Sequence, residues 1–343
     1  MSKNRKIIVI LTIILLGIVL FLANLFVGSV KIPFKDILDV LLKANNDNSL
    51  NTIILNYRLP QAITALLAGS ALAVSGLLMQ TLFRNPLADP SMLGISSGAS
   101  LGVGVVILLT GVITSTSVSS LGWWSTIGVS LAALVGAVAV LFLILAFSTK
   151  TKNMATLIII GLMIAYIASS VTDILKFFSM KEDIHAFVIW GMGSFSNVGT
   201  ERLTTLSISV IIGLLASFFL SKNLNVLLLG DTYAENLGLN IKRNNLIIIL
   251  ISGYLTAIVT AYCGPVAFIG LAVPHIARFI FKSSDHRLLL PMTMLIGMDL
   301  ALLCNVIARL PGFDGNLPIN AVTAFIGAPI VIAVIIKGNK VVK

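Results

Sequence analysis

Long apolar stretches separated by short polar loops run through the whole chain. Ten of them are long enough to cross a bilayer as helices, which takes about 20 residues each. They cover residues 7–27, 60–82, 93–113, 123–147, 156–176, 202–220, 244–262, 265–282, 288–308 and 321–337. The pattern therefore predicts an all-α, polytopic membrane protein with about ten transmembrane helices, in which residues 1–343 form a single transmembrane domain.

Three segments need separate interpretation. Residues 7–27 follow a basic start like a signal peptide, but the apolar run is longer than a signal core and no small-residue cleavage site follows it. We expect an uncleaved first helix. Residues 31–56 are amphipathic and mixed in charge, and residues 185–195 predict a short surface helix.

The composition agrees with this pattern. Hydrophobic residues make up 57% and charged residues 10% of the chain, and the mean hydropathy is +1.05, whereas soluble domains are roughly 25% charged. We expect no sizeable soluble domain. Cys263 and Cys304 lie in or beside apolar segments, so buried free thiols are expected, and no Cys/His cluster has the spacing of a metal site.

The basic residues predict the orientation. With the N-terminus in the cytoplasm, 15 of the 23 Lys and Arg residues fall on the cytoplasmic side of the ten spans, in keeping with the positive-inside rule. We therefore expect a multi-pass protein of the cell membrane with both termini in the cytoplasm. The net charge of +10 then follows from the excess of Lys and Arg in the cytoplasmic loops. Nucleic-acid binding is not expected, because the charges are scattered over short loops without a basic patch.

Small residues recur at four-residue spacing on two predicted spans: Ala65, Gly69 and Ala73 on one, and Gly94, Gly98 and Gly102 on the next. Such stripes let helix backbones approach closely in lipid. Helix packing is therefore favoured over direct contact with a substrate.

Two polar connections stand out. The elbow at 84–90 contains two prolines and the charges of Arg84 and Asp89, and it predicts a rigid loop that another molecule meets. Residues 221–243 are too short and too polar in the middle to span. Asp231 is expected to cap a short helix there that Gly238 ends. A helix so short is not stable alone and should pack against something.

Proline and glycine interrupt predicted spans near the C-terminus. Pro274 lies within 265–282, where an interior proline frees a backbone carbonyl and permits a kink. For His275 a packed, hydrogen-bonded side chain is favoured over a ligand. Gly327 and Pro329 break the last span, as a hinge or pathway element would.

Eight stretches from Arg58 onward resemble, in order, the FecCD-type permeases, which are the membrane subunits of type II ABC importers for iron–siderophores, haem and cobalamin. They are RLP (58–60), SGLLMQ (75–80), NPLADP (85–90), LGISSGASLG (93–102), GDTYAENLG (230–238), FIGLAVPHIAR (268–278), DHR (285–287) and LPINAVTAFIGAP (317–329). The resemblance implies the type II ABC importer permease fold and a transport subunit without catalytic residues.

The resemblance also implies partners. A second permease subunit, identical or different, would complete a dimer in membrane lipid. Two ABC ATPase subunits would lie beneath it, and an extracytoplasmic substrate-binding protein or lipoprotein would dock on top. No metal and no cofactor would be bound by this chain, since ATP and magnesium would belong to the ATPases.

Residue roles follow from the same resemblance. Arg58 and Arg309, exposed on the outer side by the charge count, would meet acidic residues of the binding protein. The elbow residues Asn85, Pro86 and Leu87, with the loop 150–156, would belong to the cytoplasmic gate. The loop 221–243 would seat in the ATPases through Gly230, Asp231, Ala234, Glu235, Leu237 and Gly238.

Three positions complicate the comparison with the family. The family often has a second arginine where this chain has Gln61, which reduces the docking charge or leaves it to another subunit. It tends to have an aspartate where this chain has Asn305. Asp299 lies within a span, where a carboxylate is costly and usually functional or paired.

Other functions are disfavoured. ATP must be handled by a partner, because the chain has no G-x-x-x-x-G-K-[ST] phosphate loop. An ion-coupled secondary transporter, with Asp299 and Asp173 as relays, would favour inverted repeats, and none is seen. An intramembrane aspartyl protease would need glycine at position 228, where this chain has leucine. Among substrates we expect a ferric siderophore first, then haem, then cobalamin.

Overall fold

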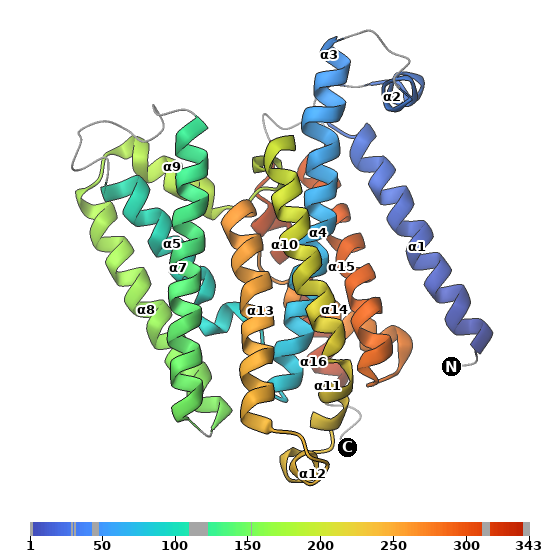
Figure 1. The fold of residues 1–343 in the computed structure, drawn as a ribbon. Coiled ribbons are helices and arrows are strands. Elements are labelled where there is room, and N and C mark those ends of the chain that lie inside the picture. Colours follow the sequence, from blue (N-terminus) through green and yellow to red (C-terminus); the bar gives the residue numbers. More distant parts are fainter. Residues whose placement is uncertain are drawn as a thin grey trace.

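The structure is a computed structural model that describes residues 3–28, 30, 32–42, 48–109, 123–151, 153–310 and 316–338. Within these ranges the chain forms helices and no strand. Seven helical segments are long and apolar enough to cross a membrane, and three more apolar helices are shorter. Together they correspond to the ten predicted spans, so the all-α, polytopic prediction is confirmed (Figure 1).

The ten membrane helices form one bundle. They are α1 (Lys3–Phe26), α4 (Leu59–Leu82), α5 (Ile95–Gly104) continued by η3 (Val105–Leu109), α7 (Trp123–Lys150), α8 (Met154–Phe178), α10 (Thr200–Phe219), α13 (Ile241–Cys263), α14 (Ile269–Phe281), α15 (His286–Ala308) and α16 (Ile319–Gly338). The outer part of the third predicted span, residues 110–113, lies outside the described residues.

Short helices lie at the two ends of this bundle. In Figure 1 the upper end carries α2 (Phe34–Leu41), α3 (Asn48–Asn51) and α9 (Lys181–Gly191), and the lower end carries α12 (Asp231–Asn236) and the N-terminal end of α1. The segments 31–56 and 221–243 are thus at opposite ends, as the span count predicted. A π-helical turn, η1 (Thr52–Arg58), leads directly into α4.

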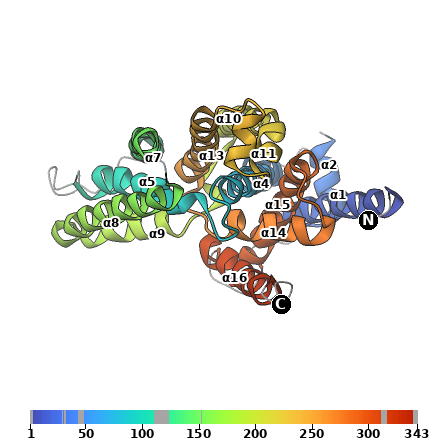
Figure 2. The same cartoon turned by 90° about the horizontal axis from the view of Figure 1, so that it is seen from below.

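The central helix α4 is surrounded by α10, α13, α14 and α15 (Figure 2). Small side chains make this possible, because a Cβ at Gly69 would lie 2.2 Å from the carbonyl oxygen of Gly297 on α15. A Cβ at Gly76 would lie only 1.9 Å from the carbonyl oxygen of Gly270 on α14. The small-residue stripe on α4 therefore serves helix packing, as predicted.

The second stripe packs α5 against α7. A Cβ at Gly98 would lie 2.6 Å from the carbonyl oxygen of Gly136, and one at Gly102 would lie 2.1 Å from that of Ala132. The glycines thus set the spacing of this helix pair. Here too the packing interpretation is confirmed.

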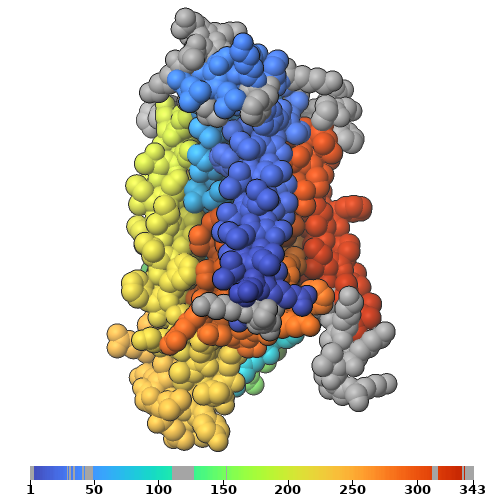
Figure 3. Space-filling view, turned by 90° about the vertical axis from the view of Figure 1, so that its right-hand side faces the viewer, coloured from blue at the N-terminus to red at the C-terminus, as the bar shows by residue number. Residues whose placement is uncertain are grey.

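α1 lies on the outside of the bundle (Figure 3), and only 11% of its most apolar window is buried. It packs mainly on α15, where the side chain of Asp299 fills the space above Gly17. A lipid-facing helix of this kind needs an apolar surface, and its exposed leucines and isoleucines supply one.

Two predicted boundaries were wrong. The span expected at 265–282 begins as a helix only at Ile269, because Gly264 and Phe268 adopt positive φ angles of 74° and 68° that no helix contains. The short surface helix expected at 185–195 is α9, which spans Lys181–Gly191 and has its Trp190 side chain buried.

Candidate functional site

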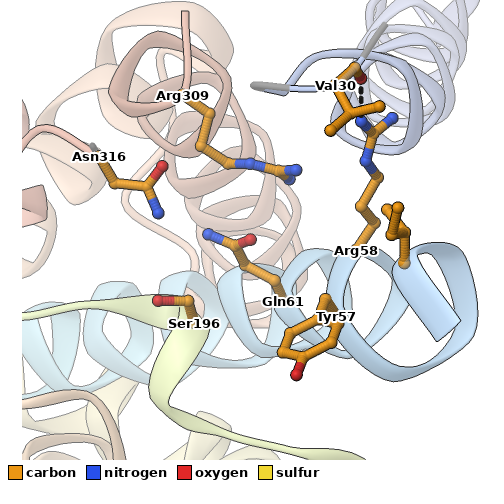
Figure 4. Close-up of a pocket in the computed structure, with 8 residues that line it drawn as sticks. Val30, Tyr57, Arg58, Gln61, Ser196, Arg309 and Asn316 are labelled. Atoms are coloured by element: carbon orange, nitrogen blue, oxygen red, sulfur yellow. Dashed lines mark hydrogen bonds between the residues drawn. The ribbon is translucent and has the colours of Figure 1, made fainter. Parts of the chain in front are cut away.

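A pocket of about 270 Å³ opens at the upper end of the molecule, where α4 and α15 meet the end of α1 (Figure 4). Two arginines supply its charge, and polar side chains from three other elements complete it. The described residues that line it, none of them acidic, are Val30, Ile53, Tyr57, Arg58, Gln61, Ser196, Arg309 and Asn316. Residues 311–315 lie outside the described residues.

Arg58 is buried, with only 2% of its surface exposed, so the expectation that it projects from the outer face was wrong. Its guanidinium donates to the carbonyl oxygens of Leu25 at 2.6 Å, Phe26 at 3.0 Å and Val30. Leu25 and Phe26 are the last residues of α1, whose final carbonyls have no partner within the helix. Arg58 therefore caps α1, where a cation also suits the helix dipole.

Arg309 is half-buried and reaches the same helix end. Its Nη1 donates to the carbonyl oxygen of Asn24 at 3.1 Å. The Nη2 atoms of Arg58 and Arg309 both lie within 3.0 Å of the position that a Cβ on Gly28 would occupy. The two guanidinium groups are therefore close to each other. Burial, and then the charge of Arg58, lower the pKa of Arg309 to about 10. Both side chains remain charged at neutral pH.

Gln61 and Asn305, the two departures from the family pattern, contact each other. Gln61 Nε2 donates to Asn305 Oδ1 at 3.0 Å, and Asn305 Nδ2 donates to Asn24 Oδ1 at 2.6 Å. All three side chains are buried. This row of amides joins α4, α15 and α1 beneath the pocket, and no sequence pattern links positions so far apart.

The elbow at the lower end is held in shape by its own backbone and side chains. Asn85 Oδ1 accepts from the Leu87 amide at 2.9 Å, and the Ala88 amide donates to the Asn85 carbonyl at 3.0 Å. Asp89 Oδ1 accepts from the Ser91 amide, which starts η2 (Pro90–Leu93). Burial raises the pKa of Asp89 above its ordinary value, against the effect of that hydrogen bond. The rigidity of the elbow stays a prediction, which these hydrogen bonds support.

His275 connects α14 to the elbow. Its Nε2 lies 2.7 Å from the carbonyl oxygen of Pro86, so the imidazole donates there. This is the packed, hydrogen-bonded histidine that was expected. Pro274 lies inside α14. Because proline has no amide hydrogen, the carbonyl of Gly270 has no partner within the helix. Gly76 of α4 lies against this same carbonyl.

Gly327 lies against the strained start of α14. A Cβ at Gly327 would lie 2.6 Å from the Cβ of Phe268, a non-glycine residue at φ 68°. The Ala267 amide donates to Asn320 Oδ1 of α16 at 3.1 Å. Pro329 lies two residues after Gly327 inside the same helix. α16 thus packs at Gly327 and Asn320 against the segment that starts α14, six residues before Pro274.

The segment 221–243 forms two short helices, α11 (Ser221–Leu227) and α12. Asp231 does not cap α12. The capping position is Gly230, at φ 103°, and Asp231 is the first helical residue, with its carboxylate paired to Arg84 at 2.5 Å. Gly238 ends α12 as predicted: at φ 83° its amide donates to Glu235, and the Leu239 amide donates to Ala234.

α12 presents an apolar surface to its surroundings. Ala234 is buried, whereas Asp231, Glu235 and Gly238 are exposed. Large apolar side chains are also exposed over α11 and α12, namely Leu228, Leu229, Tyr233 and Leu237. Leu237 was expected from the sequence, and Leu228, Leu229 and Tyr233 were not. Their apolar side chains in an otherwise polar loop were the signal that could have identified them.

A second cavity, of about 420 Å³, lies between α12 and the elbow. It is lined by Arg84 and Asp231 and, from the 150–156 loop, by Asn153 and Met154. Residue 152 of that loop lies outside the described residues. The structure thus brings together the predicted gate and coupling segments.

The remaining candidates lie apart from both sites. Asp299 contacts Gly17 on α1, and Asp173 is exposed and paired with Lys176 at 3.1 Å. Cys263 and Cys304 are free and buried, as expected. Among the described residues no group of three or more His, Cys, Asp or Glu side chains could hold a metal ion.

Comparisons with known proteins agree with this architecture. A model of the FecCD transport family matches residues 14–337. A "putative ABC transporter permease protein" of Methanocaldococcus jannaschii is 31% identical over 99% of each chain. The vitamin B12 import system permease protein BtuC of Klebsiella pneumoniae is 36% identical over 82% of each chain. A solved structure described as an inward-facing conformation of a "putative metal-chelate type ABC transporter" has a TM-score of 0.82 at 29% identity, covering 96% of this chain and 99% of the other.

Proposed function

Because the chain belongs to the FecCD transport family, we propose that this importer permease carries a metal chelate across the cell membrane, with a ferric siderophore as the first candidate. The observation that carries the proposal is the fold shared, over 96% of the chain, with a metal-chelate type ABC transporter. The chelate would be delivered by an extracytoplasmic binding protein, and both termini would be cytoplasmic.

Transport by this chain requires partners. A second permease subunit would complete the pathway, and two ATPase subunits would supply ATP and magnesium. Exposed leucines and a tyrosine, in the link between α11 and α12 and on α12, support the ATPase contact, because apolar side chains outside the membrane favour burial against another protein. Asp231, Glu235 and Leu237 lie at that surface, and Gly230, Ala234 and Gly238 shape it.

The cationic pocket at the other end supports docking of an acidic partner. Arg58 and Arg309 concentrate two positive charges there, and such charges steer and orient an acidic protein more than they add affinity. Since Arg58 is committed to the carbonyls of α1, Arg309 is the better placed of the two for direct contact. Asn85, Pro86 and Leu87 would form the gate, and Pro274, His275, Gly327 and Pro329 the moving parts beside it.

Cobalamin is the second candidate, because permeases of vitamin B12 import systems are among the similar proteins, and haem is the third. Uptake in a strain that lacks the gene separates the three. Iron-55-labelled ferric siderophore, haem and cobalt-57-labelled cobalamin are supplied in parallel, with the gene restored on a plasmid as the control. We expect the deletion to abolish uptake of the siderophore alone. Loss of cobalamin or haem uptake instead would overturn the siderophore assignment.

A further inference from the structure

Two separate contacts join α11 and α12 to the last turn of α4. We propose that they form a clamp through which movement of α11 and α12 reaches the elbow at 84–90. The α4 clamp consists of Thr81, Arg84, Asn225, Asp231 and His286. It rests on the proposed function, because the force that moves α12 would come from the ATPases.

The first contact is made by Arg84, just beyond the end of α4. Its Nη2 donates to Asp231 Oδ1 at 2.5 Å and to the carbonyl oxygen of Leu227 at 3.3 Å. One guanidinium therefore holds the last residue of α11 and the first residue of α12. Arg84 has φ 46°, which a non-glycine residue rarely adopts. The backbone is thus held in an unfavourable conformation that directs this side chain away from α4 and onto α12.

The second contact runs through His286, whose side chain is buried. Asn225 of α11 donates through Nδ2 to Asp285 Oδ1 at 2.6 Å, and its Oδ1 accepts the His286 amide at 2.8 Å. These two bonds fix the orientation of the Asn225 amide. Hydrogen bonds from the Arg287 amide and from Asn225 lower the pKa of Asp285, which keeps it a carboxylate.

The orientation of Asn225 determines the role of each ring nitrogen of His286. Nδ1 lies 2.9 Å from the same Asn225 Oδ1, so Nδ1 must be the protonated donor. Nε2 lies 2.8 Å from the Thr81 hydroxyl, whose one proton has two acceptors within reach, Nε2 of the neutral ring and the carbonyl oxygen of Leu77, also at 2.8 Å. A continuous set of hydrogen bonds therefore joins α11, the start of α15 and the last turn of α4.

Thr81 and Arg84 are three residues apart, so the two contacts act on neighbouring points at one helix end. The gate residues follow immediately, and Pro86 is in turn bonded to His275. α11 and α12 cannot move relative to the bundle without moving the end of α4 or breaking both contacts. The cavity of about 420 Å³ beside Arg84 and Asp231 leaves room for such movement.

The test uses the full chain assembled with its ATPase subunits in lipid nanodiscs. Leu87, which is 36% exposed, is changed to cysteine, and its rate of reaction with a maleimide is measured without nucleotide and after trapping with Mg-ATP and vanadate. Cys263 and Cys304 stay in place because they are buried, and protein without Leu87→Cys gives their background. With the clamp intact, we expect trapping to change the rate by about fivefold or more.

The variants are compared when they hold the same amount of trapped nucleotide. Arg84→Ala together with Thr81→Val should then reduce the change in reaction rate to less than about twofold. Lys176→Gln, which breaks the described ion pair at the other end of the molecule, should leave it at the wild-type value. Arg84→Ala alone should lower the response, and Arg84→Lys, which keeps a cation for Asp231, should retain more of it than Arg84→Ala.

The outcomes separate the clamp from the function on which it rests. If trapped nucleotide does not change the reaction rate in protein with an intact clamp, both the proposed function and the clamp are overturned. If trapping changes the maleimide reaction rate equally in the wild type and in the variant with Arg84→Ala and Thr81→Val, the clamp alone is overturned. If that variant does not assemble, the single variants of Arg84 decide: equal responses of Arg84→Ala, Arg84→Lys and the wild type overturn the clamp.

Discussion

At the scale of single residues, the end of α1 concentrates the unusual chemistry. Arg58 and Arg309 bind its last carbonyls, and Asn24 joins it to Asn305 and through that residue to Gln61. The two positions at which the family tends to have arginine and aspartate thus hold a neutral amide pair. Neutral amides avoid the desolvation cost of two buried ions. The pair keeps the contact between α4 and α15 without adding a third cation beside two others.

This pairing predicts strong coupling between the two positions. Gln61→Arg alone should destabilise the protein by about 3 kcal/mol, because a buried charge without a counter-ion would join Arg58 and Arg309. Asn305→Asp alone should cost less, since Arg309 is near. The double variant should recover most of the loss, so the double-mutant cycle measured by chemical unfolding in detergent should give a large interaction energy. Additive single effects would mean that the two side chains do not interact.

Single residues also show what a sequence can and cannot reveal. The end of α12 at Gly238 was predictable, because a glycine with a positive φ is a local signal. The burial of Arg58 was not, since it depends on carbonyls of a helix more than 30 residues away. Asp231 was expected as a cap on local grounds, but its carboxylate is taken by Arg84, which is 147 positions distant.

At the scale of helices, α4 and α14 cross closely at Gly76 and Gly270: among the described glycines, a Cβ added at Gly76 would come nearest to another helix, 1.9 Å from the Gly270 carbonyl oxygen. Pro274 frees the Gly270 carbonyl at this point, so the two helices meet where one of them is weakest. We expect a helix pair with so little space between its backbones to move as a unit, so that a rearrangement of α14 would reach the central helix.

Gly76→Ala tests this crossing. Its Cβ would overlap the Gly270 carbonyl, and overpacking of this kind costs about 1–3 kcal/mol. Gly128→Ala is the matched control, because a Cβ there meets nothing within 4 Å, and alanine is the better helix former. We expect a lower unfolding temperature in detergent for the first and an equal or higher one for the second. Equal temperatures for both variants would contradict the close crossing.

α12 provides the second helix-scale prediction. Glu235→Lys reverses an exposed charge on the surface proposed to meet the ATPases, and deletion of residues 231–238 removes that surface. Both should abolish uptake while the protein stays in the membrane, as judged by immunoblots of membrane fractions. Lys222→Gln on α11, outside the proposed contact residues, serves as the control and should retain uptake. Normal uptake by stably expressed Glu235→Lys would show that α12 does not couple to an ATPase.

The helices themselves were largely predictable from the sequence, because lipid demands long apolar stretches and the apolar runs mark them. The exceptions have local backbone causes. The segment before α14 is not helical because Gly264 and Phe268 have positive φ angles, and an aromatic residue gives no warning of that. The continuation of α4 back through η1 was equally hidden, since the segment 31–56 looked like a separate amphipathic element.

At the scale of the whole molecule, the chain has two functional ends joined by a tightly packed centre. One end carries a cationic pocket with no acidic side chain among its described residues, and the other carries the elbow, a cavity and the apolar surface of α12. α4 runs between them and contacts both. The family membership and the order of the motifs were evident from the sequence, whereas no motif in it identifies the transported substrate.

Transport in reconstituted vesicles tests the central claim most directly. The chain is assembled with its ATPase subunits and binding protein in proteoliposomes, and uptake of iron-55-labelled ferric siderophore is followed with ATP, with a non-hydrolysable analogue and with ionophores that collapse ion gradients. We predict uptake that requires hydrolysable ATP and continues when the gradients are collapsed. Uptake that persists without ATP hydrolysis and stops with the ion gradient would contradict an ATP-driven importer.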